Sequence, residues 1–176
     1  MYIDLKNKIA LVTGGATGIG KSIAIALSNS NAKVIITSRS KKNINETLKI
    51  LPKGCRGYKL DLTKNSDVNK LYKNVKKDYG KIDIIINNIG HTLNIKNPFA
   101  PIEDWKKIID LNFITTVNVN NKFIKGMKKR NWGRIINITS IAGLEISGPS
   151  TFNVSKAALT AYTRSVGRQL AVERKN

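Results

Sequence analysis

The chain has 176 residues, of which 41% are hydrophobic and 24% charged, values that are usual for a soluble globular protein and exclude a disordered or fibrous one. This length fits one domain with a real core, no apolar run approaches membrane-spanning length, and residues 1–8 lack the basic start and apolar core of a signal peptide. The single cysteine, Cys55, excludes an intrachain disulfide and a cysteine-based metal cluster within this sequence. We therefore expect a cytoplasmic protein, in agreement with a reducing compartment.

The net charge of +20 is the extreme value of the composition, and it raises the question of nucleic-acid or anionic-membrane binding. Basic residues are spread over nearly every segment, and the densest cluster, at residues 125–130, ends a predicted helix, where cations suit the helix dipole. No aromatic residues alternate with the cations and no nucleic-acid motif is present. We interpret the charge as a solvated surface and expect neither partner, with nucleic-acid binding kept as an outside alternative.

The first predicted elements are a strand, a glycine-rich turn and a helix. Residues 9–12 form a short apolar run, as in a strand buried on both faces. Ile19, Ile23 and Leu27 then recur at helical spacing and predict one face of a helix. Between the two stand four glycines, at positions 14, 15, 18 and 20.

This turn has the properties of a phosphate site. Glycines let the backbone turn tightly and let a ligand approach, and the helix that follows offers free N–H groups with a partial positive charge. A glycine turn can also join a strand to a helix with no ligand present, so the pattern alone leaves that alternative open. The strand before and the helix after favour a dinucleotide site.

Further strands and helices alternate along the rest of the chain. Apolar runs predict strands at residues 33–37, 57–60, 82–86 and 134–138. Helical spacing predicts helices around residues 44–51, over 66–79, from 102 to near 131 with a bend, and over 151–173. The alternation predicts an α/β fold, a doubly wound, Rossmann-like parallel sheet of about five strands with helices on both faces, as a single domain over residues 1–176. Ligands of such sheets bind beyond the carboxyl ends of the strands.

Several motifs in this order and spacing make the sequence similar to the short-chain dehydrogenase/reductase family, and to its 3-oxoacyl-carrier-protein reductases. They are Thr13-Gly14-x-x-x-Gly18-x-Gly20, Asp61-Leu62, Asn87-Asn88-x-Gly90, Asn112, Ser140 and Lys156. The resemblance covers essentially the whole chain. It implies a nicotinamide dinucleotide cofactor, a small carbonyl or alcohol substrate, and a homo-oligomer formed through the two long C-terminal helices.

The resemblance also implies which residues contact the cofactor. The glycine turn would line the pyrophosphate, the pair after the third strand would contact the adenine, and the residues after the fourth strand would lie near the adenosine ribose, with Asn87 holding the central strand. The implied cofactor residues are Thr13, Gly14, Thr17, Gly18, Ile19, Gly20, Asp61, Leu62, Asn88, Ile89, Gly90 and Lys156.

The residues after the second strand favour NADP(H) over NAD(H). Enzymes specific for NAD place an acidic residue there to bind the ribose hydroxyls, whereas an Arg suits the additional phosphate of NADP. No Asp or Glu occurs between Val34 and Lys42, and Ser38 and Arg39 follow the strand. We expect these two residues to bind the phosphate; the alternative is that Arg39 is one more exposed charge of a very basic protein.

The catalytic group implied by the resemblance is an Asn, a Ser, a Tyr and a Lys four residues after that Tyr. Asn112, Ser140 and Lys156 match, but Phe152 stands at the position of the Tyr. In the family the Tyr hydroxyl exchanges a proton with the substrate oxygen, Lys lowers the phenol pKa and binds the nicotinamide ribose, Ser donates to the substrate oxygen, and Asn supports a water. Phenylalanine keeps the ring and loses that proton.

Two hypotheses about the function follow. The first is an NADP-dependent oxidoreductase that transfers a hydride between nicotinamide and a carbonyl or secondary alcohol, with slow turnover supported by Ser140 and a water. The second is a catalytically impaired or inactive cofactor-binding pseudoenzyme, or a fragment, because family members continue beyond the last helix whereas this sequence ends at Asn176. The loss of a positioned general acid costs on the order of a hundred to ten thousand fold in rate.

Overall fold

A computed structural model describes residues 3–145 and 147–173. Its residues form two compact units, Met1–Asn88 with Asn118–Ile136, and Ile89–Val117 with Asn137–Asn176. We describe each unit by itself. The single domain expected over residues 1–176 stays a prediction, and both ends of that range lie outside the described residues.

The sheet confirms the predicted parallel α/β architecture. Its five strands are β1 (Ile9–Val12), β2 (Lys33–Ser38), β3 (Arg56–Lys59), β4 (Ile84–Asn87) and β5 (Arg134–Asn137). They run in the order β3-β2-β1-β4-β5, and Leu11 at the centre pairs with Ile35 on one side and Ile85 on the other. All four residues of β1 and of β4 are buried, as expected where helices cover both faces of a parallel sheet.

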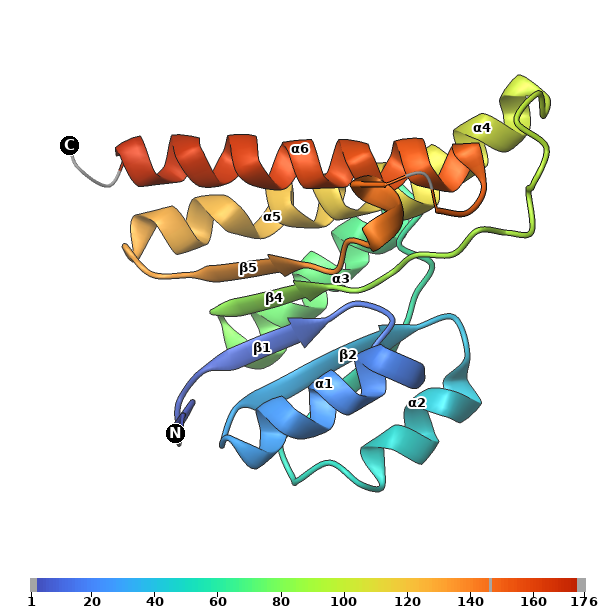
Figure 1. The fold of residues 1–176 in the computed structure, drawn as a ribbon. Helices are drawn as coiled ribbons and strands as arrows, with labels where there is room; N and C mark the ends of the chain where they lie inside the picture. The colour runs from blue at the N-terminus through green and yellow to red at the C-terminus, as the bar shows by residue number, and fades with distance from the viewer. Residues whose placement is uncertain (1–2, 146, 174–176) are drawn as a thin grey trace. The chain divides into compact units, whose positions relative to one another are not determined.

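The helices of the first unit cover both faces of its strands. Figure 1 shows α1 (Gly18–Asn29) and α2 (Lys41–Leu48) on one face and α3 (Asn65–Tyr79) on the other. Most of α5 (Thr115–Lys129) belongs to this unit and packs on α3, where the rings of Tyr72 and Phe123 lie 5.5 Å apart. Gly80, at φ 74°, ends α3 as predicted.

The buried face of α1 differs from the face that the apolar spacing predicts. Gly20, Ala24 and Ser28 are buried, whereas Ile19 is 65% exposed. Small side chains let a helix approach a sheet closely. The face of α1 that packs on the sheet is therefore set by the small size of its side chains more than by their hydrophobicity. The exposed Ile19 then stands in the first turn of the helix, beside the glycines.

The elements that lie wholly within the second unit are helical. The unit contains α4 (Ile102–Ile109), a π-helical turn η1 (Asp110–Ile114), a short 3-10 turn η2 (Ile141–Gly143) and α6 (Ser150–Glu173), and α6 contacts the other three. In the long helical region that the sequence predicts, η1 follows α4, and both the amide and the hydroxyl of Thr115 donate to the Asp110 carbonyl. The bend in this region stays a prediction. In the described ranges no helix combines the length and the apolarity that crossing a membrane requires.

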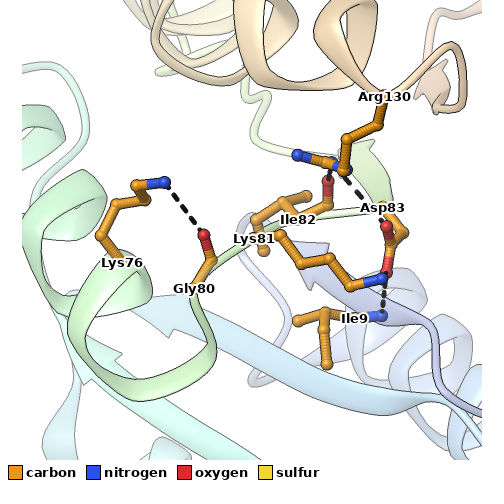
Figure 2. Close-up of polar contacts among 7 residues, drawn as sticks. All are labelled: Ile9, Lys76, Gly80, Lys81, Ile82, Asp83 and Arg130. Carbon is orange, nitrogen blue, oxygen red and sulfur yellow. Dashed lines mark hydrogen bonds and ion pairs between the residues drawn. The ribbon is translucent and has the colours of Figure 1, made fainter.

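A buried carboxylate connects the amino ends of the central strands. Figure 2 shows Asp83, 2% exposed, accepting a hydrogen bond from the amide of Ile9 at 3.0 Å. The same carboxylate pairs with Lys81 at 3.1 Å and with Arg130, at the end of α5, at 3.7 Å. The Arg130 guanidinium also donates to the carbonyl of Ile82 at 2.6 Å. The Asp83 side chain therefore connects the starts of β1 and β4 with the residue that follows α5. These contacts lie at the amino ends of the strands, whereas the glycine turn follows the carboxyl end of β1.

We predict that Asp83→Ala lowers the free energy of unfolding by about 2 to 3 kcal/mol, because it leaves the buried amide of Ile9 without an acceptor and two cations without their partner. The cost stays below that of a fully buried ion pair, since the side chains of Lys81 and Arg130 are 40% and 34% exposed. Urea denaturation measures it. Asp104→Ala, which removes an exposed pair with Lys107, is the matched control and should cost less than about 1 kcal/mol. Equal effects of the two variants would contradict the assignment.

Candidate active site

The conformation of the glycine turn in the first unit requires glycine at specific positions. Gly14 and Gly18 have φ values of 61° and 51°, in the left-handed region that favours glycine. A Cβ on Gly20 would collide with the carbonyl of Gly14 and would lie 2.6 Å from Nδ2 of Asn88. At Gly18, in contrast, a Cβ would have no atom within 4 Å. The backbone is therefore tightly packed at Gly20, whereas there is open space next to the α-carbon of Gly18.

The N-terminus of α1 presents free donors at this open side. Thr17 is the N-cap residue, but its side chain makes no capping hydrogen bond, and the first turn carries no acidic residue. Among the residues that the structure describes, the amides of Gly18, Ile19 and Gly20 have no acceptor; the first helical bond runs from Lys21 to Thr17. Uncapped amides at a helix N-terminus form an anion site.

Thr13 and Asn88 join the glycine turn to the end of β4. The hydroxyl of Thr13 accepts from the amide of Asn88 at 3.0 Å, and the Asn88 side chain donates to the carbonyls of Thr13 and Gly14 at 3.2 and 3.3 Å. Asn87, 2% exposed, donates to the side chain of Asn120 on α5 at 2.9 Å. The predicted residues Thr13, Gly14, Gly20 and Asn88 are thus in mutual contact.

The end of β2 brings the residues expected to select the cofactor next to the turn. The amide of Gly15 donates to the carbonyl of Thr37 at 3.1 Å, and Ser38 and Arg39 follow directly. The Ser38 hydroxyl accepts from the amide of Ser40 at 3.2 Å. Arg39 is exposed, and in the described ranges no carboxylate pairs with it. Its guanidinium is available to an anionic ligand.

Asp61 and Leu62 follow β3, and their side chains lie in different environments. One carboxylate oxygen of Asp61 accepts from the amide and the hydroxyl of Thr63, while the Asp61 amide donates to Asp67 at 2.7 Å. Leu62 is only 2% exposed. Leu62 therefore offers almost no surface to a ligand, whereas Asp61 is half-buried.

In the second unit, Lys156 of α6 is buried beside Phe152. Its ammonium donates to the carbonyl of Ile138 at 2.9 Å and lies 5.6 Å from the centroid of the Phe152 ring. The side chain is almost fully covered, at 4% exposure. Burial disfavours the charged form and lowers the pKa of Lys156 below its usual value.

Asn112 lies in the π-helical turn and is fully buried. Its amide nitrogen donates to the carbonyls of Ile108 and His91, both at 3.0 Å, and its oxygen accepts from the amide of His91 at 3.0 Å. A Cβ on Gly90 would lie 2.9 Å from both the Asn112 oxygen and the Lys156 nitrogen. Because Gly90 has no side chain, the Asn112 oxygen and the Lys156 nitrogen can both lie close to its α-carbon. Ile89 precedes Gly90 in the chain.

Ser140 and Phe152 complete the group of predicted catalytic residues. Ser140 caps η2, where its hydroxyl oxygen accepts from the amide of Ala142 at 3.2 Å. Among the described residues, the Ser140 hydroxyl hydrogen has no acceptor. Phe152, in the first turn of α6, is half-buried and donates its own amide to the carbonyl of Pro149. The second unit therefore holds Gly90, Asn112, Ser140, Phe152 and Lys156 together.

Two contributors of this unit are backbone groups that sequence reasoning missed. They are the Ile138 carbonyl, which holds the Lys156 ammonium, and the peptide of His91, which holds the Asn112 amide. A carbonyl or amide carries no residue-specific signal, so no sequence pattern could have identified them. Among the described residues, no three His, Cys, Asp or Glu side chains gather in a group that could hold a metal ion.

Comparison with known proteins extends over nearly the whole chain. A family model described as short chain dehydrogenase matches residues 8–174. An uncharacterized oxidoreductase of Staphylococcus saprophyticus is 33% identical over 174 residues, with 96% of this chain and 74% of the relative covered. The 3-oxoacyl-acyl-carrier-protein reductase FabG of Vibrio cholerae is 31% identical over 170 residues, with 96% and 70% covered.

Solved structures show the same fold. A short-chain dehydrogenase from Streptomyces avermitilis has a TM-score of 0.86 and 26% identity, and the match covers 93% of this chain and 61% of that one. An RhlG/NADP active-site complex from Pseudomonas aeruginosa has a TM-score of 0.87 and 27% identity, with 98% and 71% covered. This chain thus spans between about three fifths and three quarters of the length of these proteins. It belongs to the short-chain dehydrogenase family, whose members named here are oxidoreductases.

Proposed function

We propose that this chain is an NADP-dependent oxidoreductase that transfers a hydride between the nicotinamide and a carbonyl or secondary alcohol. The observation that carries the proposal is the glycine turn with the uncapped amides of Gly18, Ile19 and Gly20 at the start of α1. Free N–H groups with the helix dipole behind them suit a pyrophosphate. Solved relatives with NADP or NADPH in their names support the choice of cofactor.

The residues present fit such a cofactor. The space above Gly18 is open, Ile19 offers an exposed apolar surface, and Arg39 offers an uncompensated cation. In our proposal the turn from Thr13 to Gly20 binds the pyrophosphate. Ser38 and Arg39 bind the additional phosphate, because a guanidinium and a hydroxyl are suited to phosphate oxygens. The proposal assigns the adenosine to Asp61, Leu62, Asn88, Ile89 and Gly90.

The proposed catalytic residues are Asn112, Ser140 and Lys156, with Phe152 at the position of the missing phenol. When bound, the reduced cofactor would supply the hydride. Ser140 would donate its hydroxyl hydrogen to the substrate oxygen, Lys156 would bind the nicotinamide ribose, and Asn112 would hold the backbone at His91. The inactive pseudoenzyme remains the second candidate, and Phe152 is the observation that favours it.

The substrate proposed is a small molecule with a ketone or a secondary hydroxyl. A 3-oxoacyl compound is the first class to test, because a 3-oxoacyl reductase is among the relatives. Assembly of copies through the two long C-terminal helices, α5 and α6, stays a prediction.

Arg39→Ala should weaken NADPH binding by about tenfold while leaving NADH binding unchanged, since the guanidinium bonds only the phosphate that NADPH has and NADH lacks. The rise in melting temperature that each nucleotide causes measures both affinities. Lys125→Ala, which removes a cation from the exposed surface of α5, is the matched control and should leave both unchanged. Equal losses for the two nucleotides would show that Arg39 does not select the cofactor.

Phe152→Tyr should raise the rate of ketone reduction at least tens of fold, because it adds a phenol next to the Lys156 ammonium, which lowers the phenol pKa. The assay follows NADPH oxidation with ethyl acetoacetate, a soluble 3-oxo ester. Phe99→Tyr adds the same hydroxyl at a side chain that is 90% exposed, and it should leave the rate unchanged. The absence of any gain from Phe152→Tyr would contradict the proposed role of position 152.

A further inference from the structure

Reduction of a carbonyl requires a proton at oxygen as well as a hydride at carbon, and Phe152 has no proton to give. We propose that the Lys156 ammonium itself donates this proton to the substrate oxygen, so that Lys156 is the acid of the reaction. The inference rests on the proposed function, because it concerns the same substrate in the same group of residues.

The other hydroxyls of this part of α6 are already committed as donors. Thr151 donates to the carbonyl of Ile95 at 3.3 Å, and Ser155 donates to the carbonyl of Phe152 at 2.7 Å. Thr160 donates to the carbonyl of Lys156 at 3.0 Å. Tyr162 lies six residues beyond Lys156, about 9 Å further along the helix axis. None of these hydroxyl groups therefore replaces the missing phenol.

Lys156, in contrast, keeps uncommitted hydrogens beside Phe152. An ammonium has three N–H bonds, and among the described residues only the carbonyl of Ile138 accepts from it. That carbonyl lies two residues before Ser140, the other group with a free donor hydrogen. The Phe152 ring, 5.6 Å from the nitrogen, borders the same position. In our proposal, a carbonyl oxygen that accepts from Ser140 also accepts one of these ammonium hydrogens beside the ring.

Among the described residues, no carboxylate forms an ion pair with the Lys156 ammonium. Of the elements packed against α6, η2 has no titratable side chain, η1 contributes the exposed Asp110, and the Asp104 carboxylate of α4 is paired with Lys107 at 2.8 Å. His91, in the loop that Asn112 holds, is exposed, and its Nδ1 accepts from the amide of Leu93. Burial is the cause of the lowered Lys156 pKa, and a lower pKa makes the ammonium a stronger acid.

The proposed step balances. When bound, the reduced dinucleotide would supply a hydride to the carbonyl carbon, which would form a C–H bond as the C=O π bond breaks. The oxygen would form an O–H bond as one N–H bond of Lys156 breaks. The ketone is reduced to an alcohol and the nicotinamide is oxidised. The neutral amine then takes a proton from water. The reaction in this direction should fail at high pH, where the amine has no proton to donate.

The test combines a rate with a direct titration in the full 176-residue chain. The kcat for reduction of ethyl acetoacetate by NADPH is measured against pH. The Lys156 side chain is titrated separately, without cofactor, by NMR of lysine-labelled protein, and its signal is identified by its loss in Lys156→Arg. We expect a titration midpoint below that of the exposed lysines, and a kcat that falls about tenfold per pH unit above it.

Lys156→Arg keeps the positive charge and the hydrogen-bond donors but does not release a proton in this pH range. It should lower kcat at least a hundredfold, abolish the fall at high pH, and retain the rise in melting temperature caused by NADPH. Lys107→Arg, on the exposed surface of α4, is the matched control, and its rate and pH profile should equal those of the wild type.

A kcat that stays constant through the Lys156 midpoint, or a Lys156→Arg variant with the wild-type rate, would overturn the inference. The inference would also be overturned if the wild type bound NADPH without reducing ethyl acetoacetate while the Phe152→Tyr variant reduced it. That result would leave the proposed cofactor and substrate class unchanged. If NADPH does not raise the melting temperature of any variant, the proposed function itself is overturned, and the inference with it.

Discussion

The arrangement of the first unit depends on one steric constraint, the absence of a side chain at Gly20. At this position the first turn of α1 touches the carbonyl of Gly14 and the side chain of Asn88, and a Cβ would occupy the space of both. The contact places α1 close against the strands through its small residues, Ala24 and Ser28. The uncapped amides lie in this first turn, where Gly18 and Ile19 are exposed, and uncapped amides at a helix N-terminus suit an anionic ligand.

Much of the fold follows from patterns in the sequence, whereas the details of the site depend on tertiary contacts. The buried apolar runs predict every strand to within two residues at either end, and Gly80 marks the end of α3. The strand order is not encoded in any local pattern. The exposure of Ile19 contradicts the predicted apolar face because close packing on a sheet selects small residues over large ones. The partners of Lys156 and Asn112 are backbone groups, which carry no sequence signal.

The two units differ in how completely they retain what the reaction needs. The first unit has the open turn, the available cation of Arg39 and the bonded Thr13 and Asn88. In the part of the chain that the structure describes, the second unit has a buried lysine, a serine whose hydroxyl hydrogen has no acceptor and a hydrogen-bonded Asn112, but a phenyl ring where a phenol is expected. Binding and chemistry can therefore be tested separately in this protein. In our account the proton comes from Lys156, one helical turn beyond Phe152.

The central claim is that the chain transfers a hydride although position 152 carries a phenyl ring and no phenol. The most direct test incubates the wild-type chain with ethyl acetoacetate and NADPH that carries deuterium at C4 of the nicotinamide, and examines the product by mass spectrometry. We predict ethyl 3-hydroxybutanoate with deuterium on the carbinol carbon, at a low rate. Formation of this deuterated alcohol by Phe152→Tyr but not by the wild type, at any pH, would contradict the claim and identify the natural chain as a cofactor-binding protein without turnover.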